Sequence, residues 1–184
     1  VFGSGVSAIC AIASTLKAGD LSLCEENLYG CTVRLFKEIF QKFKVKTAWV
    51  DFTDISVINQ IQELQPSMIW LESPTNPLLK LVDLAEIAKI AKRHGLITVC
   101  DNTFCSPWVQ RPIDHGFDIT MHSATKYLNG HSDVIGGIAV IAPGKEELKE
   151  QLEFLQNAVG SVLSPFDSFM AVSYTHLTLP TILR

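Results

Sequence analysis

The sequence predicts an α/β fold in which a mostly parallel sheet is covered by helices on both faces. Short apolar segments alternate with longer helical patterns along most of the chain. Several short segments are apolar at nearly every position, which is typical of strands buried on both sides. Strands of this kind separated by helices favour parallel pairing with helical crossovers.

Six segments have the composition of strands and five have helical periodicity. The predicted strands are residues 21–24, 46–52, 67–72, 96–101, 118–122 and 136–141, and the predicted helices are residues 5–17, 31–43, 55–65, 83–94 and 145–159. The fourth helix is the clearest, because Leu84, Ile87 and Ala91 recur at helical spacing between charged residues. We expect Gly95 to end it.

The composition describes one well-buried globular domain. The chain has 184 residues, of which 47% are hydrophobic and 18% are charged. Its net charge of −4 gives no indication of a nucleic-acid or membrane partner. The apolar runs 96–100 and 135–142 are too short to cross a bilayer. Five scattered cysteines without a CxxC pair predict free thiols and a cytoplasmic location.

Three polar clusters directly follow predicted strands. They are residues 72–77, 101–103 and 123–126. Ligands of open α/β sheets bind outside the carboxyl ends of the strands. We therefore expect the three clusters to face a single site.

Lys126 is the candidate nucleophile of that site. At the end of a buried strand its amine would be partly desolvated, which favours Schiff-base formation. The hydroxyl groups of Ser123 and Thr125 are spaced to hold one anion, such as a phosphate. The alternative is a surface lysine in a turn that the two hydroxyl groups cap.

Asp101 ends its predicted strand, where a carboxylate often contacts a metal, a ribose or a ring nitrogen. It could equally cap the turn at Asn102 and Thr103. Tyr29, between a strand and a helix, could stack on a flat ring or pack in the core. Asn76, in a turn made rigid by two prolines, could bind a cofactor oxygen or cap the turn.

Other chemistries have weaker support. The segment 3–5 precedes a helix and could hold a phosphate at the helix N-terminus, although it matches neither the P-loop nor the dinucleotide pattern. The histidines have no metal-ligand spacing, so we expect no metal site. No Gly-x-Ser-x-Gly elbow is present, which disfavours a serine hydrolase.

Five stretches occur together in an order that resembles the Cys/Met-metabolism, or transsulfuration, family of enzymes that use pyridoxal 5′-phosphate (PLP). They are SGVSAI at 4–9, LYGCT at 28–32, ESPTNP at 72–77, DNTF at 101–104 and SATKYLNGHSD at 123–133. The resemblance covers about residues 1–172. It implies the large PLP-binding domain of a fold-type I, aspartate-aminotransferase-like enzyme, truncated at both ends.

The resemblance implies a role for each matching residue. Lys126 would be the Schiff-base lysine and proton shuttle, Asp101 would pair with the pyridine nitrogen, and Tyr29 would stack on the ring. Asn76 would reach the phenolic oxygen of the cofactor, and Thr103 would lie beside its ring.

The phosphate of PLP would be held by four residues. Gly5 and Val6 would donate backbone N–H groups, and Ser123 and Thr125 would contribute their hydroxyl groups. Val6 stands where the family commonly has methionine, and Cys31 stands where it commonly has a second glycine after Tyr29.

The implied activity is elimination or replacement at carbon–sulfur bonds, of the cystathionine γ-lyase or γ-synthase type. The substrate would be a sulfur amino acid or a homoserine ester, and the full-length protein would be a cytoplasmic homo-oligomer, a dimer of dimers. The alternatives are another fold-type I PLP enzyme, such as an aminotransferase, or an inactive fragment. Residues 173–184 do not match the family, and we expect a non-native tail in which Pro180 breaks any helix.

Overall fold

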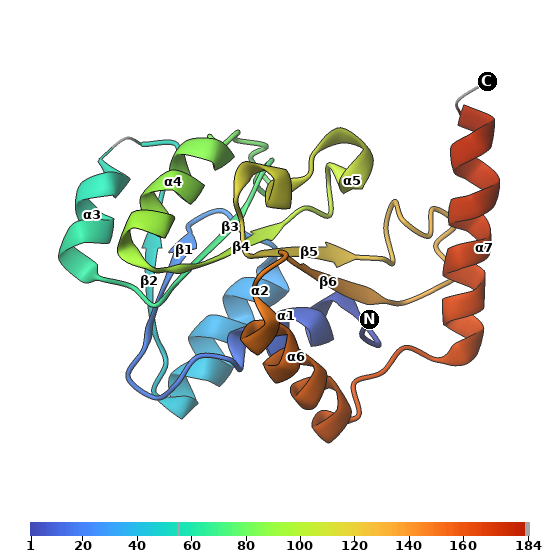
Figure 1. Ribbon diagram of the computed structural model, residues 1–184, viewed down its shortest axis with the longest axis horizontal. Helices are drawn as coiled ribbons and strands as arrows, with labels where there is room; N and C mark the ends of the chain where they lie inside the picture. Colours follow the sequence, from blue (N-terminus) through green and yellow to red (C-terminus); the bar gives the residue numbers. More distant parts are fainter. Residues whose placement is uncertain (55, 183–184) are drawn as a thin grey trace.

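A six-stranded sheet forms the centre of the protein, whose computed structural model describes residues 1–54 and 56–182 (Figure 1). The strands are β1 (Leu21–Glu25), β2 (Lys46–Val50), β3 (Met68–Glu72), β4 (Ile97–Asp101), β5 (Ile119–Ser123) and β6 (Gly137–Ile141). Their order is β2-β1-β3-β4-β5-β6. All neighbouring pairs are parallel except β5 and β6, which are antiparallel. The predicted mostly parallel α/β sheet is confirmed.

Helices cover both faces of the sheet (Figure 1). The α-helices are α1 (Gly5–Ala13), α2 (Gly30–Arg34), α3 (Val57–Leu64), α4 (Leu84–His94), α5 (Ser106–Val109), α6 (Glu146–Val159) and α7 (Pro165–Ile182). A π-helical turn, η1 (Leu35–Ile39), and two 3₁₀ segments, η2 (Phe40–Phe43) and η3 (Pro112–His115), complete the secondary structure. The sequence did not predict α5, η3 or α7.

Two hydrophobic layers lie on opposite sides of the sheet. The first joins α1, the segment α2–η2 and α6 to strand residues such as Trp70 and Val99. Within it, the ring of Phe36 meets that of Trp70 edge-on, at 5.6 Å between centroids. The second layer joins α3 and α4 to the alternate strand residues, such as Ile69 and Cys100. Since side chains alternate along a strand, this division assigns every strand residue to one face.

Helix boundaries differ from the predictions where polar groups intervene. The first helix ends at Ala13 rather than 17, because the hydroxyl groups of Ser14 and Thr15 donate to helix carbonyl groups. The predicted helix 31–43 is divided into α2, η1 and η2. Gly95 ends α4 as expected, with φ at 66°, a left-handed conformation that glycine adopts freely. The predicted helix start at residue 55 lies outside the described residues.

The expectation that Pro180 breaks any helix in the tail is wrong, because α7 continues through it to Ile182. A proline removes one backbone hydrogen bond and disturbs the preceding turn. Only two residues of α7 follow Pro180, so this cost falls in the last turn. The final two residues of the 173–184 segment lie outside the described residues.

Large apolar side chains are exposed along α6 and the start of α7, which stands beside the sheet in Figure 1. Phe154, Phe166 and Phe169 are each exposed by at least 65%. Over the described ranges, no helix combines the length and apolar character that a membrane crossing needs. All five cysteines are free, as predicted, and Cys24 and Cys100 are fully buried.

Candidate active site

The carboxyl ends of β3, β4 and β5 lie side by side and carry three polar side chains to one face of the sheet. Glu72, Asp101 and Ser123 are the last residues of these strands. Each lies two positions after a residue of the layer that contains α1. The three predicted clusters therefore lie at one edge of the sheet.

A chain of hydrogen bonds joins β4 to β5 at this edge. One carboxylate oxygen of Asp101, Oδ1, accepts from the backbone N–H of Thr103 at 3.0 Å and from its hydroxyl group at 2.6 Å. The hydroxyl oxygen of Thr103 in turn accepts from the backbone N–H of Ser123 at 2.8 Å. Burial raises the pKa of Asp101, and the bonds from Thr103 partly offset this effect. The network fixes the orientation of a buried carboxyl group.

The N-terminus of α1 approaches the same edge. Ser4 caps the helix by accepting from the backbone N–H of Ser7 at 3.0 Å. A Cβ atom added to Gly5 would lie 2.9 Å from the Cβ of Ser123, so only glycine allows this contact. In the described chain, the N–H groups of Gly5 and Val6 donate no hydrogen bond. Two free donors at a positive helix end therefore lie beside Ser123.

Thr125 lies beside this helix end, but its hydroxyl group is already engaged. Its Oγ1 accepts from the backbone N–H of Gly136 at 3.0 Å. The next residue, Gly137, exchanges two backbone hydrogen bonds with Phe2, each 2.8 Å long. The start of β6 thus holds the approach to α1 in place.

We predict that Gly137→Ala unfolds the protein at markedly lower temperature than the unaltered chain. The added Cβ would lie 2.6 Å from the carbonyl carbon of Ser4 and would overlap its oxygen, and backbone cannot move away cheaply. Overpacking of this kind costs about 1–3 kcal/mol or more. Thermal denaturation measures the loss, with Gly30→Ala as the control because its Cβ would meet open space. Equal melting temperatures for both variants would contradict this close packing of Gly137 against Ser4.

Tyr29 is held at the site through its backbone. Its N–H donates to Oε2 of Glu72 at 3.0 Å. The tyrosine is 41% exposed, so it is not a core-packing residue. Its hydroxyl group accepts a hydrogen bond from the thiol of Cys31 at 3.3 Å. The ring is therefore available at the surface while its backbone is fixed.

Lys126 lies in the turn that follows β5. Its N–H donates to the carbonyl of Ser123 at 3.2 Å, and its carbonyl accepts from Gly130 at 2.8 Å. The expectation that the lysine is partly desolvated is wrong for this chain, because Lys126 is exposed. The turn carries it beyond the buried end of β5, where it remains accessible.

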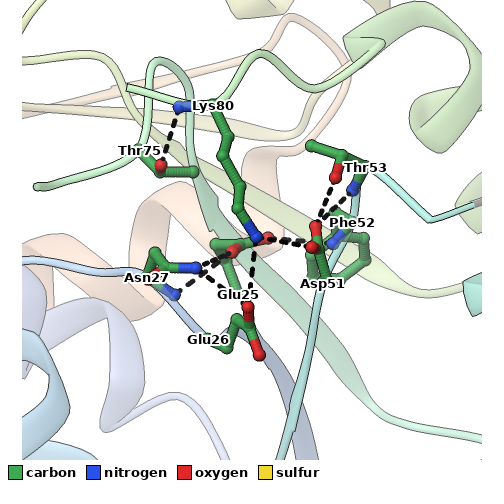
Figure 2. A network of polar contacts seen from close by, with 8 residues as sticks. All are labelled: Glu25, Glu26, Asn27, Asp51, Phe52, Thr53, Thr75 and Lys80. Atoms are coloured by element: carbon green, nitrogen blue, oxygen red, sulfur yellow. Dashed lines mark hydrogen bonds and ion pairs between the residues drawn. The ribbon is translucent and has the colours of Figure 1, made fainter. Parts of the chain in front are cut away.

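Asn76 lies in a loop that an ion-pair network holds against the ends of β1 and β2 (Figure 2). Backbone N–H groups of Thr75 and Lys80 close the loop, each through a 3.0 Å bond to the other residue. The amine of Lys80 reaches Asp51 at 2.5 Å and Glu26 at 3.2 Å. The hydrogen bond from Lys80 lowers the pKa of Asp51 to about 2. Asn76 is half-buried and, in the described chain, its side chain makes no hydrogen bond.

Glu72 and His122 are buried ionisable residues at this end of the sheet to which the sequence assigns no role. Glu72 was recognised only as the first residue of a cluster, although it ends a buried strand as Asp101 does. His122 is buried with Nδ1 unpaired, and burial lowers its pKa to about 4. It alternates to the opposite face from Ser123. Residues 1–54 and 56–182 contain no group of three side chains able to hold a metal ion.

These residues fit PLP. A phosphate requires free N–H donors, which the N-terminus of α1 offers beside Ser123. A pyridine nitrogen requires an acidic partner, and in the described part of the chain Asp101 has its second carboxylate oxygen unengaged. Lys126 provides an accessible primary amine on the adjoining turn.

Comparisons with known proteins agree with this composition of the site. The model of a family described as Cys/Met metabolism PLP-dependent enzyme matches residues 1–175. A cystathionine beta-lyase from Coxiella burnetii is 48% identical over 172 residues, which are 93% of this chain and 44% of the relative. Human cystathionine gamma-lyase is 42% identical over 170 residues, which are 92% of this chain and 42% of the relative.

A solved structure has the same fold. It is the cystathionine gamma-lyase of Lactobacillus plantarum complexed with L-serine, which matches with a TM-score of 0.90 and 42% identity. The match covers 95% of this chain and 45% of that one. The chain thus spans less than half the length of each of these relatives.

Proposed function

The chain belongs to the Cys/Met metabolism family of PLP-dependent enzymes, and we propose that it supplies the cofactor-binding part of an enzyme acting on carbon–sulfur bonds in amino acids. The observation that carries this proposal is the series of contacts at the sheet edge. Tyr29 contacts Glu72, Asp101 is joined through Thr103 to Ser123, and Ser123 contacts both Gly5 and Lys126.

Each side chain has a defined task in this proposal. When bound, PLP supplies an electron sink for negative charge that develops next to the substrate amine. The amine of Lys126 would hold PLP by condensing with its aldehyde group, with release of water, and would later move a proton to or from the substrate. Asp101 keeps the ring nitrogen protonated. The ring of Tyr29 covers one face of the site and excludes water.

The remaining predicted residues bind and orient the cofactor. The N–H groups of Gly5 and Val6 and the hydroxyl group of Ser123 bind the phosphate at the N-terminus of α1. Thr125 contributes its hydroxyl group to phosphate binding after it gives up its hydrogen bond with Gly136. Thr103 orients Asp101 and lies beside the ring, and Asn76 contacts the phenolic oxygen.

The substrate proposed is a sulfur amino acid. Cleavage is favoured because lyases from Coxiella burnetii and human are 48% and 42% identical to this chain. A γ-synthase type of transfer from a homoserine ester to a thiol is the second candidate. It is supported by 44% identity to a probable cystathionine gamma-synthase of Herpetosiphon aurantiacus. An aminotransferase loses support, since these relatives are lyases and synthases.

Two further features of the full-length protein are part of the proposal. Free cysteines support a cytoplasmic location. The exposed apolar side chains on α6 and α7 support a homo-oligomer, a dimer of dimers, in which such surface is covered. We further propose that residues 1–172 are a partial PLP-binding domain and that residues 173–184 are a non-native tail.

Parallel assays of the full-length protein test the activity. Cystathionine, an O-acyl-homoserine with cysteine, and methionine are supplied separately, with and without PLP. We expect PLP-dependent release of a keto acid and ammonia from cystathionine. Formation of a new amino acid from a keto-acid acceptor, without cleavage of a carbon–sulfur bond, would instead identify an aminotransferase.

A further inference from the structure

Two carboxyl groups lie next to each other beneath the candidate cofactor site. Glu72 and Asp101 are direct partners in the parallel pairing of β3 with β4, and both side chains lie on the face that contacts α1. Glu72 is 2% exposed and Asp101 is 5% exposed. Two neighbouring carboxyl groups that are both buried do not readily ionise together, because a charge on one raises the energy of a charge on the other.

In the part of the chain that the structure describes, no positive side chain neutralises this pair. Across the described ranges, neither Glu72 nor Asp101 makes an ion pair. The helix α1, which packs over this face, has no charged residue. Titratable groups that interact with the pair are Tyr29, which precedes α2, and Cys100 on β4. Cys31 and Arg34 on α2 interact with Tyr29, Cys105 interacts with Cys100, and Cys24 on β1 lies in the same layer. Lys126 is exposed on the turn after β5.

Glu72 also fixes the loop that carries the aromatic ring. Its Oε2 accepts the backbone N–H of Tyr29 at 3.0 Å, across 43 residues of sequence. Tyr29 is the residue that precedes α2, and it has no side-chain cap of its own. The carbonyl oxygen of a neutral carboxylic acid or amide can also accept this bond, although less strongly than a carboxylate, so the bond does not require a charge on Glu72.

We propose that Glu72 is a positioning residue of the cofactor site, which anchors Tyr29 and remains uncharged so that Asp101 alone bears the negative charge facing the ring nitrogen. This role rests on the proposed function. Burial and the neighbouring Asp101 raise the pKa of Glu72 to about 8, which agrees with a protonated side chain at neutral pH.

An uncharged Glu72 gives cofactor-free protein a specific pH dependence. The unfolded chain releases the Glu72 proton near the ordinary value of 4.5, whereas the folded protein keeps it until about pH 8. The folded state then binds more protons in this window, so stability falls as pH rises through it. We expect Glu72→Gln, which imitates the protonated acid, to reduce the fall in the urea denaturation midpoint between about pH 5 and 8. An unchanged pH profile would overturn the proposal.

A double-mutant cycle tests whether the two carboxyl groups act together. The effects of Glu72→Gln and Asp101→Asn on the midpoint at pH 8 should be non-additive, since either change removes their mutual repulsion. The control is Glu25→Gln, because Glu25 is also a buried strand-end glutamate that accepts a backbone N–H, from Phe52 at 2.9 Å, but its side chain alternates to the other face. Glu25→Gln and Asp101→Asn should be additive. Additivity in both cycles would overturn the proposal.

Cofactor binding tests the anchoring of Tyr29. In full-length protein titrated with PLP, Glu72→Ala should raise the dissociation constant about tenfold, because the Tyr29 N–H loses its partner. Glu72→Gln should restore the affinity to within about twofold, which a requirement for negative charge would not allow. If the unaltered protein binds no PLP, the proposed function fails and this role with it. If the unaltered protein binds PLP and Glu72→Ala binds it equally well, the proposed role of Glu72 is refuted and the proposed function is unaffected.

Discussion

Replacing Lys126 with alanine is expected to abolish the visible absorbance that PLP acquires when its aldehyde group condenses with a lysine amine. The loss of the amine also removes the group proposed to move the substrate proton, and such acid–base groups contribute about 10²–10⁴-fold to turnover. Cofactor affinity should fall less, since the phosphate contacts at Gly5, Val6 and Ser123 remain. Absorbance spectra and steady-state rates of full-length protein measure both effects.

The fold should tolerate this substitution. Lys126 is exposed, and among the described residues it makes no ion pair, so its removal should change stability by no more than about 0.5 kcal/mol. Lys149→Ala is the matched control, because Lys149 is an exposed lysine on α6 whose 3.7 Å contact to Glu153 lies away from the sheet edge. A persistent absorbance band in Lys126→Ala would show that another group holds the cofactor and that Lys126 is a surface lysine.

The positions of the strands were predictable because burial dominates their composition. β3, β4 and β5 lie within one residue of the predicted segments at each end, since their alternate side chains enter the two hydrophobic layers. The extended prediction for β2, to residue 52, failed because Phe52 donates its N–H to Glu25 instead of continuing the ladder. That bond joins residues 27 positions apart and leaves no signal in the local sequence.

The three predicted clusters lie at one edge of the sheet, as expected, whereas the contacts of their side chains were only partly predictable. Placing the clusters after strands required only that parallel strands end at the same edge. The engagement of Thr125 by Gly136 and the exposure of Lys126 depend on how the turn after β5 folds back on β6. Glu72 was missed because its two neighbours, Asp101 and Tyr29, are 29 and 43 residues away in sequence. Strand register places them together.

The same strand register, which places Glu72 beside Asp101, explains why the proposal gives these two acids opposite protonation states. A ring nitrogen that is to remain protonated requires a carboxylate facing it. A second carboxylate buried beside the first would repel it, so one of the two acids is favoured to keep its proton. Thr103 favours ionisation of Asp101 by donating two hydrogen bonds to one oxygen. Glu72 receives only one, from a backbone N–H, and is correspondingly the group that retains its proton.

Asp101→Asn is expected to separate stability from activity. Asparagine keeps the shape of the side chain, and its oxygen can accept both hydrogen bonds from Thr103. The anionic partner of the ring nitrogen is lost, and removal of one such preorganised electrostatic contact costs about 10²–10³-fold in turnover. Steady-state rates of full-length protein saturated with PLP measure this loss.

The stability of Asp101→Asn should be unchanged or higher at neutral pH. Burial raises the pKa of Asp101 above its value in the unfolded chain, so ionisation of the folded protein costs stability as pH rises past the ordinary range for aspartate. Asparagine removes this cost. Asp118→Asn is the control with the opposite expected result, because Asp118 is buried at the amino end of β5 and forms an ion pair with Lys145 at 2.7 Å. Asp118→Asn should lower the unfolding midpoint and leave turnover of the remaining folded enzyme intact. If Asp101→Asn instead lowers stability and retains turnover, Asp101 serves only to cap the turn at Thr103 and is not the partner of the cofactor nitrogen.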